Sequence, residues 1–308
     1  MPDLTDPAHA LSPSLGRRAF VGLSAGASAF GGAALAAFAQ SAELGKPHPP
    51  LVSEVDPAIV ALHSTISYAA PGGERTLDAY IAEPKDAGPA TPALVVVQAI
   101  WGVDAQLRDT VRRLAKAGFI AVAPDLYTGL AAPNGDGATD FAPFRDIAAK
   151  LSDDVVDADL AAAAKHVRTA GGSPGRKVGV MGFCMGGAIT LRQAVDNAAR
   201  FAAAVVFYGK VRYGTTGNQG TITPIALDYA DHVGVPLAGN WGQRDTSILA
   251  ADVTALDGRL TELAKAHDFK IYPEAGHAFF DDTRDSYVAT AASDAWTRTL
   301  SWFGRHLT

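Results

Sequence analysis

The pattern of hydrophobic and polar positions along the chain predicts strands and helices in alternation. Two strand-like runs, 65–68 and 76–82, flank Pro71-Gly72-Gly73 and predict an antiparallel hairpin. Short apolar runs then predict strands at 93–98, 119–123, 177–181, 203–207, 235–239 and 269–272. Helical patterns lie at 105–117, 153–169, 188–199, 251–266 and 287–303. This alternation predicts an α/β fold, a doubly wound and mostly parallel sheet with helices on both faces.

The most distinctive motif lies where the strand 177–181 meets the following helix. Its residues are Gly182-Phe183-Cys184-Met185-Gly186-Gly187, the G-x-C-x-G form of a nucleophile elbow. A sharp strand-to-helix turn strains the backbone at the nucleophile and needs small neighbours, which explains the glycines. The sulfur would stand above a helix N-terminus, whose dipole favours thiolate over thiol. A lone cysteine is often buried and inert, but the glycine spacing favours a nucleophile here.

Asp245 and His277, which both follow Cys184 in the sequence, could complete a catalytic triad. Asp245 ends a Gly-containing loop after the strand 235–239, although it could instead cap a helix or form a turn. Among the eight histidines, His277 alone combines a strand end, an adjacent glycine and a position after the acid. Imidazole can take the thiol proton, and a carboxylate can orient the imidazole. The order nucleophile, acid, histidine is the one that this architecture requires.

Attack on a carbonyl also needs two backbone N–H groups to hold the oxyanion. One is expected from Met185, directly after the nucleophile. The other is expected from Ile100, in the loop after the strand 93–98. Ligands of such sheets bind beyond the carboxyl ends of the strands, where all these residues lie.

Five segments together resemble the dienelactone hydrolase (carboxymethylenebutenolidase) family, over roughly residue 65 to the C-terminus. They are 97–103, 123–127, 180–187, 242–245 and 276–279. The resemblance implies an α/β-hydrolase fold and a Cys-His-Asp triad, which carries over onto Cys184, His277 and Asp245. It also implies hydrolysis of a small ester or lactone through an acyl-enzyme, with no dissociable cofactor.

The chain departs from the family pattern at two positions. Ala99 stands where the family usually has a glutamate that holds the resting thiol. Asp281 stands where the family has one of its arginines for the substrate carboxylate, and Arg284 is the nearest arginine. Arg284, or Arg145 in the expected loop 141–147, could bind a substrate carboxylate, but either could be a solvated surface cation. A carboxylate-bearing lactone is therefore less well supported than hydrolysis itself.

Loop and turn aromatics near the same strand ends could line an apolar pocket for the substrate. They are Trp101, Tyr127, Phe183, Trp241 and Phe279. The alternative is ordinary packing beneath loops, and for Tyr127 and Asp125 a role in loop structure is the stronger interpretation.

The N-terminus is expected to be a twin-arginine signal peptide over residues 1–39. Arg17-Arg18 precede an apolar, Ala/Gly-rich stretch, and Ala37-Phe38-Ala39 has the form of a cleavage site. The stretch is too short and too rich in glycine for a secure membrane span, although an uncleaved anchor is an alternative. We therefore expect export by the twin-arginine machinery, a periplasmic location, a flexible lead at 40–60 and one domain at 61–308.

Composition narrows the remaining possibilities. The net charge of −6 comes without a basic stripe, which argues against nucleic-acid binding. One cysteine excludes an intramolecular disulfide, and no Cys/His cluster has zinc spacing, so no metal is expected. The leading hypothesis is a monomeric, exported hydrolase of a small ester or lactone. A carboxylesterase or thioesterase without lactone preference is the second, favoured somewhat by Ala99, and a binding protein without turnover is the third.

Overall fold

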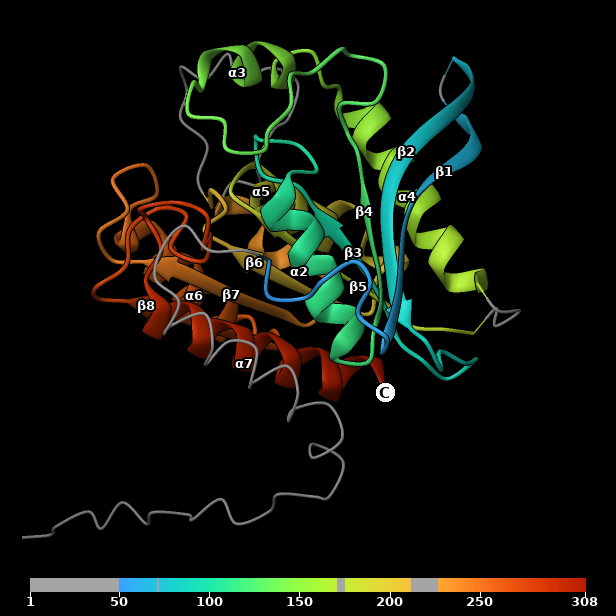
Figure 1. The fold of residues 1–308 in the computed structure, drawn as a ribbon. Helices are drawn as coiled ribbons and strands as arrows, with labels where there is room; N and C mark the ends of the chain where they lie inside the picture. The colour runs from blue at the N-terminus through green and yellow to red at the C-terminus, as the bar shows by residue number, and fades with distance from the viewer. Residues whose placement is uncertain (1–49, 71, 171–174, 212–226) are drawn as a thin grey trace, which may run out of the picture.

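The computed structural model describes residues 50–70, 72–170, 175–211 and 227–308, and in them one sheet has the strand order β1-β2-β4-β3-β5-β6-β7-β8 (Figure 1). Its strands are β1 (Ile59–Ala70), β2 (Gly73–Pro84), β3 (Ala93–Val97), β4 (Ile120–Pro124), β5 (Val178–Phe183), β6 (Ala203–Phe207), β7 (Leu237–Gly242) and β8 (His267–Tyr272). The β1–β2 and β2–β4 pairs are antiparallel, and every other pair is parallel. The carboxyl ends of β3 to β8 therefore meet at one edge of the sheet.

The central strands are apolar throughout because helices cover both faces of the sheet. Every residue of β3, β4 and β6 is buried, as expected for parallel strands between two helical layers. The longer helices are α2 (Ala105–Lys116), α4 (Asp153–Thr169), α5 (Met185–Asp196), α6 (Ala250–Glu262) and α7 (Ala289–Leu307). Side chains of Asp104 and Ser152 cap the first turns of α2 and α4, respectively.

Two glycines of β5 show that helices lie on opposite faces of the sheet. A Cβ added at Gly179 would meet the ring of Phe303 from α7, whereas one at Gly182 would meet Gly186 and Thr190 of α5. Residues three apart on a strand point to opposite faces, so α7 and α5 sandwich β5. In Figure 1, α2 and α7 lie in front of the sheet. The expected doubly wound α/β architecture is thus confirmed.

The structure differs from the predicted elements at several places. The segment 141–147, expected to be a loop, forms the short helix α3 (Ala142–Ala148), because Phe144 and Ile147 share a face and are buried. The helix of the elbow begins at Met185, three residues before the predicted start, and η2 (Ala198–Arg200) follows it. A second 3-10 helix, η3 (Leu227–His232), was not predicted. The strand β8 begins at His267, two residues before the predicted start of the strand 269–272.

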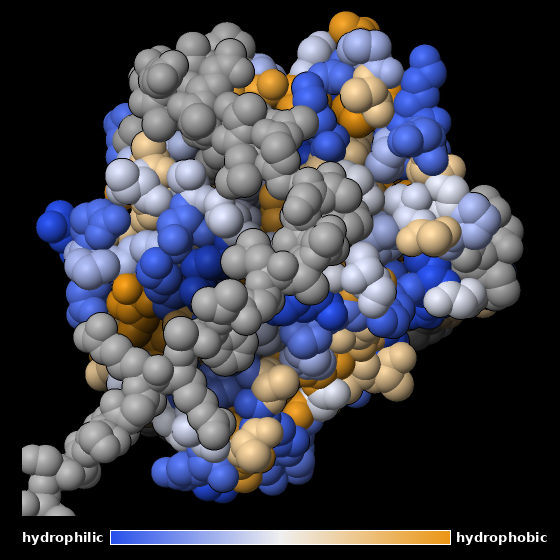
Figure 2. All heavy atoms as spheres, turned by 90° about the horizontal axis from the view of Figure 1, so that it is seen from below, coloured by the Kyte–Doolittle hydropathy of each residue, from blue (hydrophilic) through white to orange (hydrophobic). Residues whose placement is uncertain are grey.

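The end of the segment expected to be a flexible lead packs against the domain. Asp109 of α2 accepts hydrogen bonds from the backbone N–H groups of Leu51 and Val52, both at 2.9 Å, and Val52 is buried. The expected signal peptide and residues 40–49 lie outside the described residues. In the described part of the chain, no helix is both long and apolar enough to cross a membrane. Seen from below, the coloured surface mixes hydrophilic residues with separate small hydrophobic patches (Figure 2).

Candidate active site

Cys184 occupies the strained turn between β5 and α5. It is the N-cap of α5 and has φ +53° and ψ −113°, a conformation that costs a non-glycine residue about 1–3 kcal/mol. Its backbone N–H donates to Phe207 O at 3.0 Å, which ties the turn to the end of β6. The side chain is partly exposed. The fold therefore holds the sulfur in one place at the edge of the sheet.

The three glycines of the motif are required by close backbone contacts. A Cβ at Gly182 would lie 2.2 Å from Gly186 O, and one at Gly186 would lie 2.3 Å from Val97 O. A Cβ at Gly187 would lie 2.6 Å from Phe207 O. A larger residue would push α5 away from β5 at Gly182, from β3 at Gly186 and from β6 at Gly187. The motif therefore sets the distance between Cys184 and the neighbouring strand ends.

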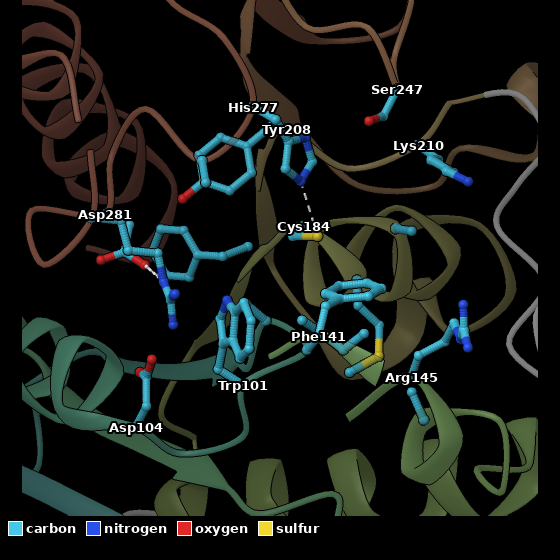
Figure 3. A pocket seen from close by; sticks show the side chains of 18 of the residues that line it. Trp101, Asp104, Phe141, Arg145, Cys184, Tyr208, Lys210, Ser247, His277 and Asp281 are labelled. Carbon is cyan, nitrogen blue, oxygen red and sulfur yellow. Dashed lines mark hydrogen bonds and ion pairs between the residues drawn. The ribbon is translucent and has the colours of Figure 1, made fainter. Parts of the chain in front are cut away.

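Asp245, His277 and Cys184 form a continuous chain of hydrogen bonds. His277 Nδ1 lies 2.7 Å from Asp245 Oδ2. Its Nε2 lies 3.0 Å from Cys184 Sγ, a contact drawn as a dashed line in Figure 3. Asp245 follows β7 and His277 follows β8, so adjacent parallel strands bring them to the same edge. Asp245 Oδ1 also accepts the backbone N–H groups of Ser247 and Ile248, at 2.8 and 3.1 Å.

The hydrogen bonds determine the charge states of Asp245 and His277. Burial works to lower the pKa of His277, but the bonds to Asp245 and Cys184 outweigh it and raise that pKa to about 10. Burial works to raise the pKa of Asp245, but the bond from His277 and the two backbone donors hold it below its usual range. At neutral pH the pair is therefore an imidazolium and a carboxylate.

Both residues expected to supply oxyanion donors, Ile100 and Met185, line the same cavity as Cys184. Met185 is the first residue of α5, and the first N–H groups of a helix have no acceptor within the helix. Ile100 comes three residues after the end of β3, which lies beside β5. A carbonyl attacked by the sulfur can thus place its oxygen between two strand ends.

The cavity has a volume of about 670 Å³ and carries charged groups on both sides of Cys184. Figure 3 shows Asp104 and Asp281 on one side of the sulfur, and Lys210 and Arg145 on the other, with Trp101 and Phe141 between them. In the described residues, no group of three or more His, Cys, Asp or Glu side chains could hold a metal ion.

Arg284, expected as a possible carboxylate-binding residue, lines the cavity but already has partners. Its guanidinium lies 3.9 Å from the centroid of the Trp101 ring. Its Nε donates to Asp281 Oδ2 at 3.0 Å and its Nη1 to Ala138 O at 2.8 Å. Arg145 also lines the cavity, on α3 rather than on a loop, and is 62% exposed. Its charge lies near Asp146.

The five aromatics expected to line the pocket divide into two groups. Trp101 and Phe183 line the cavity. Tyr127, Trp241 and Phe279 do not, and this part of the prediction needs correction. Trp241 is fully buried, where its Nε1–H donates to Gly209 O at 2.9 Å, and Phe279 is buried against Tyr208. The Tyr127 hydroxyl lies behind the cavity wall, where it donates to Ile100 O.

Among the cavity residues that the sequence analysis missed, Tyr208 and Asp104 have unusual environments. Tyr208 directly follows β6, has φ +38°, and its ring centroid lies 5.3 Å from that of His277. Asp104 caps α2 and is nearly buried, and burial raises its pKa to about 7 against the effect of the Leu107 N–H. The position of Tyr208 at a strand end was a usable signal. Nothing in the sequence shows that the cap of α2 faces the cavity.

Comparisons with known proteins agree on one family. A family model described as "Dienelactone hydrolase family" matches residues 77–307. A curated relative from Escherichia coli (strain K12), named "Putative carboxymethylenebutenolidase", is 36% identical over 261 residues, which are 83% of this chain and 91% of that protein. A "Probable 2-oxo-3-(5-oxofuran-2-ylidene)propanoate lactonase" of Bradyrhizobium sp is 32% identical over 236 residues, covering 76% of this chain and 91% of that protein.

A solved structure agrees with these relatives. The "Putative Dienelactone Hydrolase" of Klebsiella pneumoniae subsp. pneumoniae superposes with a TM-score of 0.71 at 35% identity. The match covers 81% of this chain and 100% of that one. The sheet is therefore that of the α/β-hydrolase fold.

Proposed function

The chain belongs to the dienelactone hydrolase family, and on that premise we propose that it hydrolyses a small ester or lactone with Cys184 as nucleophile. The observation that carries the proposal is the chain of hydrogen bonds from Asp245 through His277 to Cys184, at 2.7 and 3.0 Å, at the wall of the cavity. A hydrolase of dienelactone hydrolase type fits both the family and this geometry.

The reaction takes two steps with one covalent intermediate. The Cys184 thiolate attacks the carbonyl carbon, and the N–H groups of Met185 and Ile100 hold the oxyanion. The tetrahedral intermediate collapses, and the C–O bond breaks as the leaving oxygen takes a proton from His277 Nε2. Water then attacks the thioester and gives its proton to His277, and the acid leaves as the Cys184 thiolate re-forms. Asp245 keeps the His277 ring oriented throughout.

The nucleophile and the cavity favour esters over amides. A thiolate is also a good leaving group, so a poor leaving group such as an amine would lose the competition to leave the tetrahedral intermediate. Trp101, Phe141 and Phe183 give the cavity aromatic walls beside the sulfur. The named activities of the relatives, a carboxymethylenebutenolidase and a lactonase, lie in the same reaction class.

A carboxylesterase or thioesterase without lactone preference is the second candidate. Arg284 shares its charge with Asp281, so a substrate carboxylate finds that cation already paired. Ala99 lines the cavity and offers no carboxylate to hold the resting thiol. Both observations favour neutral substrates.

The test is hydrolysis of p-nitrophenyl acetate and of a cis-dienelactone by wild type and Cys184→Ala. We expect the variant to lose both activities, and the ratio of the wild-type rates decides between lactonase and general esterase. Equal rates for wild type and variant would refute cysteine catalysis.

We also propose that the protein is exported through the twin-arginine pathway and acts as a monomer in the periplasm. The support is the sequence pattern around Arg17-Arg18 and the cleavage-site pattern before Gln40. N-terminal sequencing of periplasmic protein and light scattering test these two points. An N-terminus at Met1 in the cytoplasmic fraction, or a dimer mass, would contradict them.

A further inference from the structure

Tyr127 lies beneath the loop that carries one of the two oxyanion donors. It is three residues past the end of β4 and is 3% exposed. Its hydroxyl donates to Ile100 O at 2.8 Å. Its ring also lies under Gly102, where an added Cβ would be 3.4 Å from Tyr127 Cδ2. One side chain thus supports both ends of the turn 100–102.

The backbone around Tyr127 is tied to the same loop. Leu126 N–H donates to Gln98 Oε1 at 3.1 Å, and Gln98 is fully buried at the end of β3. Tyr127 N–H donates to Asp125 Oδ1 at 2.9 Å, which fixes the turn before the ring. The segments after β3 and β4 are therefore joined by two separate hydrogen bonds, one at Gln98 and one at Ile100.

The same hydroxyl lies next to the second oxyanion donor. Tyr127 Oη is 4.0 Å from Met185 Sδ, so it contacts both residues whose N–H groups would hold the oxyanion. Gly186 sets the approach of α5 to the Val97 and Gln98 carbonyls, as described above. Gly186 thus sets the distance between α5, which carries Met185, and the end of β3. Tyr127 sets the orientation of the loop that carries Ile100.

We propose that Tyr127 is a positioning residue that holds the Ile100 amide in the oxyanion hole, an inference that rests on the proposed function. Ile100 has a loop backbone, and a loop amide can rotate unless its neighbours are fixed. The hydrogen bond to Ile100 O fixes the peptide group between Ile100 and Trp101. That peptide directly follows the one that carries the Ile100 N–H, so the orientation of the N–H is restricted as well. Without it, the Ile100 N–H points less well at the oxyanion, while Cys184, His277 and Asp245 keep their own bonds.

The test separates reactions that form an oxyanion from one that does not. Acylation of Cys184 by p-nitrophenyl acetate passes through a tetrahedral oxyanion, whereas alkylation by iodoacetamide displaces iodide and needs only the thiolate. Tyr127→Phe removes the hydroxyl and keeps the ring. Because loss of a whole oxyanion donor typically costs about 10²–10³-fold, a misdirected one should slow acylation by about 10–100-fold. The alkylation rate and KM should change less than about twofold.

Tyr80→Phe is the matched control. Tyr80 lies on β2 and is as buried as Tyr127, but it does not line the cavity. Its hydroxyl accepts a hydrogen bond from Arg112 of α2 and donates one to Glu54. We expect this variant to keep both rates, and circular dichroism and melting temperature should show that both variants are folded.

The possible results distinguish this inference from the proposed function. Slow acylation with normal alkylation in Tyr127→Phe supports the positioning role. Equal losses in both reactions, or normal acylation, overturn it while wild-type turnover stands. If wild type itself is not acylated at Cys184, the proposed function fails and the role of Tyr127 fails with it.

Discussion

Gly186→Ala should separate Met185 from Ile100, the two sides of the proposed oxyanion hole, and the structure gives the size of the separation. A Cβ at this position would lie 2.3 Å from Val97 O and 2.4 Å from Gln98 O, both backbone atoms. Real Cβ atoms essentially never come within 3.0 Å, so α5 and the end of β3 must move apart by at least 0.7 Å, the difference between 3.0 and 2.3 Å. The Met185 N–H moves with α5, and the Ile100 N–H stays with the loop after β3.

This displacement should reduce activity more than it reduces stability. A misplacement of about 1 Å can cost about 100-fold in rate, and we expect a fall in kcat of that order. Overpacking of this kind typically costs about 1–3 kcal/mol of unfolding free energy, which a folded domain can tolerate. KM should change little, because the aromatic walls of the cavity do not rest on Gly186.

Stopped-flow acylation with p-nitrophenyl acetate measures the first effect, and urea unfolding measures the second. Gly258→Ala is the matched control, because a Cβ there meets no atom within 4 Å and the residue lies inside α6. That variant should keep its rate and gain about 1 kcal/mol from better helix propensity. A folded Gly186→Ala variant with acylation within twofold of wild type would refute the reasoning.

Two further predictions concern charges in the site. Asp245→Asn should lower kcat by about 10²–10⁴-fold and lower the pKa of His277, which NMR of the labelled imidazole can follow; an unchanged titration would contradict this. Because the folded pKa of His277 is raised to about 10, the charged ring contributes stability fully below about pH 6.5 and loses it as the pH rises through about 10. The difference in melting temperature between wild type and Asp245→Asn should therefore shrink between pH 7 and pH 10.5. Asp281→Asn should leave the charge of Arg284 without its carboxylate partner. The kcat/KM for an anionic lactone, divided by the kcat/KM for a neutral ester, should then rise by about 5–10-fold, which corresponds to about 1–1.4 kcal/mol. An unchanged ratio would show that Arg284 does not meet the substrate.

The parts of the site that the sequence could predict are those set by local chain geometry. The motif around Cys184 combines strand, strained turn and helix within six residues. Gly182 avoids a contact within this motif, whereas Gly186 and Gly187 avoid contacts with the neighbouring strand ends. Asp245 and His277 each follow a predicted parallel strand, and such strands end at one edge of the sheet. The sequence therefore places all three at the same edge, and the structure brings them within hydrogen-bond distance.

Side-chain direction and distant pairing could not be predicted in this way. Tyr127 and Trp241 both lie near strand ends, but their position says nothing about whether the ring faces the cavity or the core. Arg284 pairs with Asp281 three residues before it on the same loop, but it meets Trp101 and Ala138 because two other loops converge on it, and their spacing along the chain carries no sign of this. The helix α3 is too short for its pattern to be distinguished from a loop.

Ala99 and Asp281 lead to the same conclusion about the charge of the substrate. Ala99 concerns the state of the resting thiol, and Asp281 concerns the cation Arg284. Cys184 Sγ is held by His277, whose pKa is high enough for the ring to be charged at neutral pH. Ala99, which lines the same cavity, has no carboxylate that could hold the thiol instead. A substrate anion is therefore not needed to release the nucleophile. Arg284 in turn has its charge balanced by Asp281 and its face covered by Trp101. A substrate anion is therefore not needed to satisfy that cation, and a neutral ester or lactone can use the whole of the proposed machinery.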